Sequence, residues 1–131
     1  MAHPNEAMVR EGYDAFSSGD MEALGKLMTP DVVHSVPGNN PTSGEHKGQE
    51  AVFAMYGQLF ELSGGTMEVD VQEVTAEGDD RVVSKHQARA HRDDQELDVV
   101  ETLEFTIEDG KIARIDESTS DQAAEDAFWS S

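Results

Sequence analysis

Residues 101–116, which run ETLEFTIEDGKIARID, decide the fold class of this chain. Leu103, Phe105 and Ile107 alternate with polar residues before Asp109-Gly110, as in a strand with one buried face, and a second run of mixed apolar and polar residues follows it. An Asp-Gly pair between two such runs favours a type I′ turn, the usual tight link between antiparallel strands. The stretch therefore predicts a β-hairpin, with strands over about 96–108 and 111–119.

The same alternation continues toward the N-terminus. Residues 67–72 alternate between apolar and polar side chains and predict one strand, and residues 81–92 predict another. A loop centred on Asp93-Asp94 joins the latter strand to the hairpin. The second half of the chain is therefore expected to form an antiparallel meander.

Before residue 65 the apolar period is 3.6 instead of 2, which predicts helices. They are expected over residues 4–17, over a short stretch that begins after Asp20 and stops at Thr29-Pro30, and over residues 49–62. A short strand over 31–36 and a loop over 37–48 separate the second helix from the third. A last helical turn is expected from Asp121. This order predicts a single α+β domain over residues 1–131, with the helices packed on one face of an antiparallel sheet.

The register of the predicted meander places particular residues on its apolar face. The hairpin turn pairs Ile107 with Ile112 and, if the strands run without a break, Leu103 with Asp116. The loop at 93–94 places His86 directly opposite Glu101. Buried carboxylates need a partner or a wet cavity, so this register predicts a pocket. We expect His86 and Glu101 to form an acid/base pair in that pocket.

Other polar residues are candidates for the same pocket. Asp116 and Arg114 occupy strand positions that are expected to face inward, with Asp116 as a second acid. The alternative is a bulge in the last strand, which would turn Asp116 outward and leave a solvent-facing salt bridge. His34 either reaches the pocket mouth or is a plain loop histidine. Tyr13 and Tyr56 are either core residues or hydrogen-bond donors to a ligand. The expected apolar wall consists of Phe60, Leu103 and Phe105. The alternative for the His86–Glu101 pair is a purely structural buried contact.

Composition excludes several classes of function. Twenty-eight acidic residues against nine basic ones give a net charge of -19, which repels nucleic acid. This charge fits either adaptation to high salt or an ordinary acidic protein kept soluble by charge. No apolar run is long enough to cross a membrane, and the segment from Met1 to Glu6 lacks the features of a signal peptide. We therefore expect a cytoplasmic location.

Metal and cofactor sites are not predicted. The chain has no cysteine, and its five histidines lack the short spacing of metal-ligand pairs. It also lacks a glycine-rich phosphate loop and a G-x-S-x-G nucleophile elbow.

Several motifs resemble the nuclear transport factor two-like superfamily, and its SnoaL-like family in particular. Residues 13–24 resemble its opening helix–turn–helix, residues 31–38 its first strand and Pro-Gly loop, and residues 44–51 the lead into its third helix. Residues 109–112 resemble its last hairpin, and residues 121–129 resemble the ending of one SnoaL-like subgroup. The resemblance covers nearly the whole chain. It implies a cystatin-like cone, in which a curved antiparallel sheet wraps around N-terminal helices and a central pocket, often in a homodimer.

The resemblance also implies three kinds of function. Relatives such as polyketide cyclases, ketosteroid isomerase, scytalone dehydratase and limonene epoxide hydrolase use acid/base chemistry on small apolar molecules, usually without a cofactor. The first hypothesis is therefore a cofactor-free isomerase, cyclase or hydrolase acting on a carbonyl-like substrate. The alternatives are a pocket protein that only binds a small apolar ligand, and a dimeric scaffold. No local motif in this chain matches the catalytic residues of these relatives. The relatives also tend to have aromatic residues late in the last strand, where this chain has Asp116 and Ser118.

Overall fold

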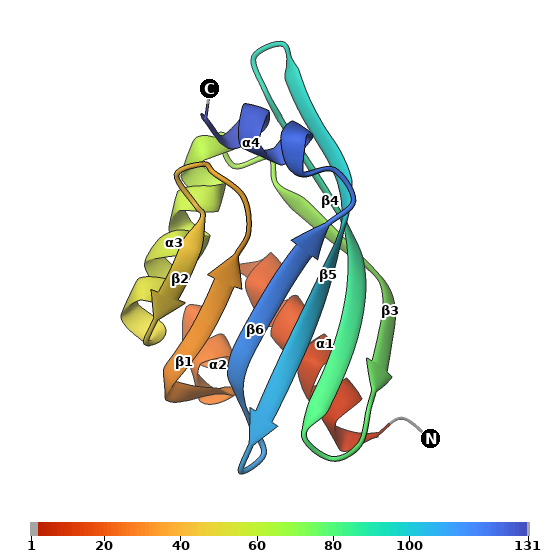
Figure 1. Cartoon of the computed structure of the whole chain (residues 1–131). Helices are drawn as coiled ribbons and strands as arrows, with labels where there is room; N and C mark the ends of the chain where they lie inside the picture. Colours follow the sequence, from red (N-terminus) through yellow and green to blue (C-terminus); the bar gives the residue numbers. More distant parts are fainter. Residues whose placement is uncertain (1–2, 131) are drawn as a thin grey trace.

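The computed structural model describes residues 3–130, so Met1 and Ala2 of the N-terminal segment lie outside the described residues. Its elements follow the predicted order of helices first and strands second (Figure 1). In chain order they are α1 (Pro4–Ser18), α2 (Met21–Lys26), β1 (Met28–Val36), β2 (Gly44–Lys47), α3 (Gln49–Leu62), β3 (Glu68–Ala76), β4 (Arg81–Arg92), β5 (Gln95–Glu108), β6 (Lys111–Thr119) and α4 (Gln122–Ser130).

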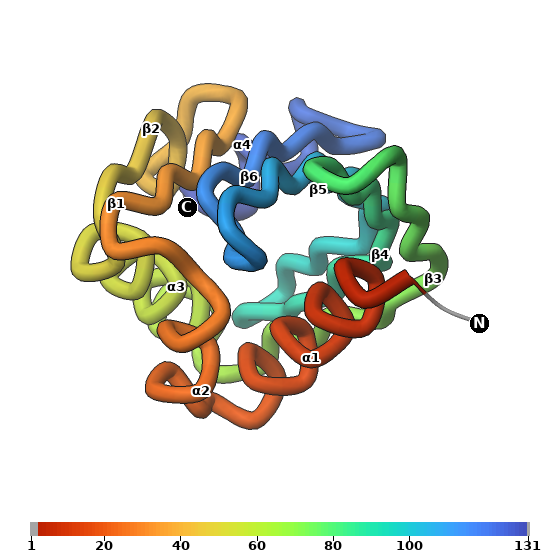
Figure 2. The backbone as a smooth tube through the Cα atoms, turned by 90° about the horizontal axis from the view of Figure 1, so that it is seen from below, coloured from red at the N-terminus to blue at the C-terminus, as the bar shows by residue number. Residues whose placement is uncertain are grey.

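The six strands form one curved sheet in the order β2-β1-β6-β5-β4-β3. Turned by 90° from Figure 1, the backbone shows the sheet curving around one side while α1, α2 and α3 close the other (Figure 2). This arrangement confirms the predicted α+β fold with a sheet wrapped around N-terminal helices. One strand pair departs from the antiparallel expectation: β1 runs parallel to β6. Parallel neighbours need a long crossover, and here α3 and the whole meander separate the two strands.

The register between β4 and β5 is the predicted one. Ser84 pairs with Leu103, and His86 pairs with Glu101, over a ladder that is unbroken from Arg81 to Arg92. A tight turn fixes this register because it leaves the strands no freedom to slide past each other. The predicted register between β4 and β5 is therefore confirmed.

The register between β5 and β6 is predicted correctly only next to the turn. Ile107 pairs with Ile112, but Thr106 pairs with Arg114, so Ala113 is an extra residue that forms a bulge. Beyond the bulge, Leu103 faces Glu117 instead of Asp116. The expected inward placement of Asp116 and Arg114 is therefore wrong, and Glu117 takes the inward position.

Packing explains why the bulge forms. Ile112 and Ile115 are three positions apart, so a regular strand would place them on opposite faces. With the bulge both side chains are almost completely buried in the main core, and the guanidinium of Arg114 points to the outer side. Burial of a second isoleucine side chain stabilises this register by about 2 kcal/mol.

Three element boundaries differ from the predictions. Strand β1 begins at Met28, although Thr29-Pro30 was expected to form a boundary, and β2 lies inside the predicted 37–48 loop. Strand β2 is an edge strand with little burial, so its sequence carries no apolar alternation. Helix α4 has nine residues, about two and a half turns instead of the single turn expected, because Phe128 and Trp129 pack on the end of the meander.

The core has two parts. The larger cluster lies between α1, α3 and the concave face of the sheet, and the smaller one lies under α4, where Phe128 and Trp129 meet Ala88, Ala90, Leu97 and Val99. Arg92 fastens this end by donating hydrogen bonds to the carbonyl groups of Leu62 and Phe128, both at 2.7 Å. Within residues 3–130, each helix is too short or too polar to cross a bilayer.

Candidate active site

The centre of the site is the predicted pair on β4 and β5. The Nε2 atom of His86 lies 2.7 Å from a carboxyl oxygen of Glu101, and the two residues are only 4 % and 5 % exposed. Burial lowers the pKa of His86, although the negative charge of Glu117 opposes this. At neutral pH the imidazole is therefore mainly uncharged, and its Nε2 atom shares a hydrogen bond with Glu101.

Tyr13 of α1 holds the other side of this imidazole. Its hydroxyl lies 2.7 Å from Nδ1 of His86 and 2.7 Å from Oγ of Ser84. Burial raises the pKa of Tyr13, so the hydroxyl keeps its proton. These contacts fix the ring orientation of His86, which an acid/base histidine requires.

A second chain of the same composition enters from β1, α3 and β6. Tyr56 places its hydroxyl 2.8 Å from Nδ1 of His34, and Nε2 of His34 lies 2.9 Å from a carboxyl oxygen of Glu117. Burial lowers the pKa of His34 to about 3 and raises the pKa of Tyr56. His34 is thus part of the polar cluster and not a plain loop histidine.

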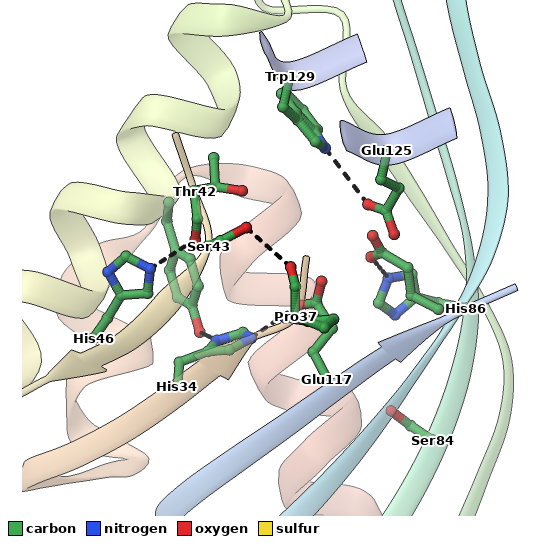
Figure 3. A network of polar contacts seen from close by, with 12 residues as sticks. His34, Pro37, Thr42, Ser43, His46, Ser84, His86, Glu117, Glu125 and Trp129 are labelled. Atoms are coloured by element: carbon green, nitrogen blue, oxygen red, sulfur yellow. Dashed lines mark hydrogen bonds and ion pairs between the residues drawn. The ribbon is translucent and has the colours of Figure 1, made fainter. Parts of the chain in front are cut away.

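Helix α4 adds a third carboxyl group. Figure 3 shows Glu125 and Trp129 reaching from α4 toward the centre, where His86 and Glu117 approach from the sheet. A hydrogen bond joins the carboxyl groups of Glu125 and Glu101, and Nε1 of Trp129 donates to Glu125 over 3.5 Å. One oxygen from each of Glu101, Glu117 and Glu125 lies within 4.8 Å of the other two.

Burial is the main reason why all three carboxyl groups hold their protons more tightly than usual. Burial, and after it the negative charge of Glu117, raises the pKa of Glu101 to about 8. Burial, and after it the negative charge of Glu125, raises the pKa of Glu117 to about 8. For Glu125, burial and then the hydrogen bond to Glu101 raise the pKa to about 8. Such coupled groups share protons, so ionised and protonated carboxyl groups coexist near neutral pH.

Glu101, Glu117 and the two histidines line a small, mainly apolar cavity of about 80 Å³, whose lining does not include Glu125. Leu103 and Phe105 belong to its wall as expected, together with aromatic and aliphatic side chains from α1, α3 and β3. Among the residues that the structure describes, none of those lining this cavity is a lysine or an arginine. The volume is below the ~300–1,000 Å³ of most small-molecule sites.

Three sequence-based expectations about the site are corrected by the structure. Arg114 and Asp116 pair with each other at 3.1 Å on the outer side, with side chains that are 38 % and 44 % exposed. The bulge in β6 is the cause. Phe60 does not line the 80 Å³ cavity, because its ring stacks on the outer side of Phe16 and lines a separate hollow.

Two carboxyl groups of the site were not predicted. Glu117 follows Asp116, the residue expected to face inward, and the spacing of Ile112 and Ile115 is the feature that could have revealed the bulge. Glu125 was not considered, although it shares a helix face with Phe128 and Trp129 at spacings of three and four residues. An apolar face that contains one glutamate indicates a buried acid.

The carboxyl cluster also bears on metal binding. Three carboxylate oxygens this close together form a donor set for a hard divalent cation. Short histidine spacing in the sequence neither predicts nor excludes such a site, because its carboxylate ligands come from three separate elements.

The fold and the site define a class of proteins. The chain belongs to the SnoaL-like domain family, whose model matches residues 9–115. It is 34 % identical to the uncharacterized protein Rv0034 of Mycobacterium tuberculosis over 122 residues, which is 93 % of each chain. Among solved structures it is similar to Bal32a from a soil-derived mobile gene cassette, with 36 % identity, a TM-score of 0.93 and 96 % of each chain covered. A protein with a cystatin-like fold from Xanthomonas campestris is 32 % identical with a TM-score of 0.88, over 95 % of this chain and 97 % of the other.

Proposed function

We propose that this protein is a cofactor-free acid/base enzyme that moves protons on a small, neutral, mainly apolar carbonyl compound. The observation that carries the proposal is the convergence of Glu101, Glu117 and Glu125 within 4.8 Å. Glu101 and Glu117 line an apolar cavity, and a buried histidine holds each of these two. Raised carboxyl pKa values provide a base and an acid at the same pH.

The proposed step is the enolisation of a ketone. Glu101 in its ionised form removes a proton from the carbon next to the carbonyl group, and that C–H electron pair forms the carbon–carbon double bond of the enol. Glu117 in its protonated form gives its proton to the carbonyl oxygen. The reverse transfers return a proton to carbon, at the same position or at another one.

The two histidines support these roles without changing charge. His86 bridges Glu101 to the hydroxyl of Tyr13, and His34 bridges Glu117 to the hydroxyl of Tyr56. Each bridge fixes one carboxyl oxygen of its glutamate, and Glu125 holds the carboxyl group of Glu101 as well. An anionic substrate is disfavoured because the lining residues provide acidic groups, no lysine or arginine, and two histidines whose lowered pKa leaves them mainly uncharged.

Isotope exchange tests the proposal directly. Small neutral ketones are incubated with the protein in D₂O containing EDTA, and loss of the hydrogen next to the carbonyl group is followed by ¹H NMR. We expect catalysed exchange in the wild type and a loss of about 100-fold or more in Glu101→Gln. Glu61→Gln, an exposed change on α3, is the matched control and should exchange like the wild type. Undiminished exchange in a folded Glu101→Gln variant would contradict the assignment, and exchange that EDTA abolishes would point to a metal instead.

The small volume of the cavity favours a second candidate, a pocket protein that binds a ligand without changing it. In that case ketones bind without isotope exchange in any variant, and Glu101→Gln alters affinity alone. A homodimer is the assembly expected for either function, and analytical ultracentrifugation measures it.

A further inference from the structure

A second hollow lies beside the 80 Å³ cavity and is larger, at about 330 Å³. It sits where the ends of α1 and α3 meet the start of β3. Its lining combines apolar and polar side chains: Phe16, Ser17, Phe60, Met67, Glu68, Val69, Asp70 and Arg89. The inner cavity and this outer hollow share Phe16, Met67 and Val69, so these three side chains form the partition between them.

Phe16 makes contact on both sides of the partition. Its ring centroid lies 5.3 Å from that of Tyr56, which belongs to the inner cavity, and 5.2 Å from that of Phe60, which belongs to the outer hollow. Met67 is half-buried beside it. Methionine is unbranched and changes rotamer easily, so this side chain can move aside at little cost.

We propose that the outer hollow binds the apolar tail of the same substrate whose carbonyl head reacts in the inner cavity. This inference rests on the proposed function and narrows its substrate to an elongated, neutral ketone with a tail of several carbons. The inner cavity alone is small for a substrate, whereas the two volumes together fall within the ~300–1,000 Å³ range of small-molecule sites.

The rim of the outer hollow fits a neutral tail. Arg89 provides its guanidinium there, but Asp70 lies 3.6 Å from one nitrogen and Asp98 lies 3.9 Å from another. Its charge is therefore opposed locally, and Glu68 adds a further acid. An anionic group would meet more acidic than basic side chains at this rim.

A series of methyl ketones from 2-butanone to 2-nonanone tests the inference. Binding is followed by NMR of protein carrying ¹³C-methyl methionine, because Met28 lines only the inner cavity and Met67 lines both hollows. We expect every ketone to shift the Met28 signal. Beyond the length that the inner cavity holds, Kd should fall about fourfold for each added methylene, the value for a buried CH₂ group.

Two neighbouring serines provide a matched pair of variants. Both serines are exposed, but Ser17 lines the outer hollow and Ser18 does not. Ser17→Phe should fill the hollow and raise the Kd of 2-nonanone to nearly that of 2-butanone, while Ser18→Phe should keep the wild-type series.

The outcomes separate the two proposals. If short ketones shift Met28 but Kd does not change with length, or if Ser17→Phe behaves like Ser18→Phe, the outer hollow does not bind the tail and only this inference fails. If no ketone shifts Met28, the ketone-binding function fails and this inference fails with it.

Discussion

His34 and His86 hold the same pair of partners, a tyrosine hydroxyl at Nδ1 and a glutamate carboxyl group at Nε2. They lie on β1 and β4, and the strands between them, β6 and β5, carry Glu117 and Glu101. Four adjacent strands thus present histidine, glutamate, glutamate and histidine to one cavity. The two carboxyl groups meet in the middle, where Glu125 joins them from α4.

The hydroxyl of Tyr56 should be required for stability. Tyr56→Phe leaves Nδ1 of the buried His34 without its partner, which costs about 1–3 kcal/mol of unfolding free energy. Urea unfolding measures this loss. The double variant Tyr56→Phe/His34→Leu removes both polar partners. Its loss of unfolding free energy should be smaller than the sum of the losses in the two single variants. A loss equal to that sum would show that the contact contributes nothing.

Neighbouring acids on β6 should differ sharply in function. Glu117→Gln removes the acid that His34 holds, so we expect isotope exchange to fall by about 100-fold. Asp116→Asn removes only an exposed partner of Arg114, so exchange should stay within about twofold and stability should change by about 1 kcal/mol at most. The reverse pattern would mean that the bulge at Ala113 does not exist in solution.

Stability should decline as the pH rises. The pKa of Glu125 is raised from 4.5 to about 8, so the folded state binds a proton that the unfolded state has released between these values. The stabilisation is complete below about pH 4.5 and is lost as the pH passes through about 8. Glu125→Gln keeps a neutral hydrogen-bonding group at this position. At pH 9 its free energy of unfolding should therefore exceed that of the wild type, by about 1.4 kcal/mol for each pKa unit by which Glu125 is raised.

Thermal unfolding from pH 5 to pH 9 checks this slope. Glu61→Gln on the exposed side of α3 is the control and should follow the wild-type curve. A Glu125→Gln curve parallel to that of the wild type would contradict a raised pKa at this position.

Added salt should stabilise the protein. The net charge of -19 is spread along the chain, so the acidic groups repel one another in the compact state. Raising NaCl from ~0.1 M to ~1 M shortens the screening length from about 10 Å to about 3 Å, and Tm should rise. An equal rise with an uncharged osmolyte would assign the effect to exclusion from the surface, and a continued rise above ~1 M would favour adaptation to high salt.

The sequence by itself determined the meander, its hairpin at Asp109-Gly110, and the contact between His86 and Glu101. These features are local, because a two-residue turn fixes the pairing of the strands beside it and alternation fixes which face is buried. The helices predicted over 4–17 and 49–62 followed from their apolar period in the same way, and the structure has them at Pro4–Ser18 and Gln49–Leu62.

Only the tertiary structure decided which acids join that pair. The bulge at Ala113 exchanges Asp116 for Glu117, because burying both Ile112 and Ile115 requires one extra residue in β6. Glu125 reaches Glu101 only once Phe128 and Trp129 pack on the meander and hold α4 against it. Both effects arise from the packing of apolar side chains between elements far apart in the chain, which no local pattern specifies.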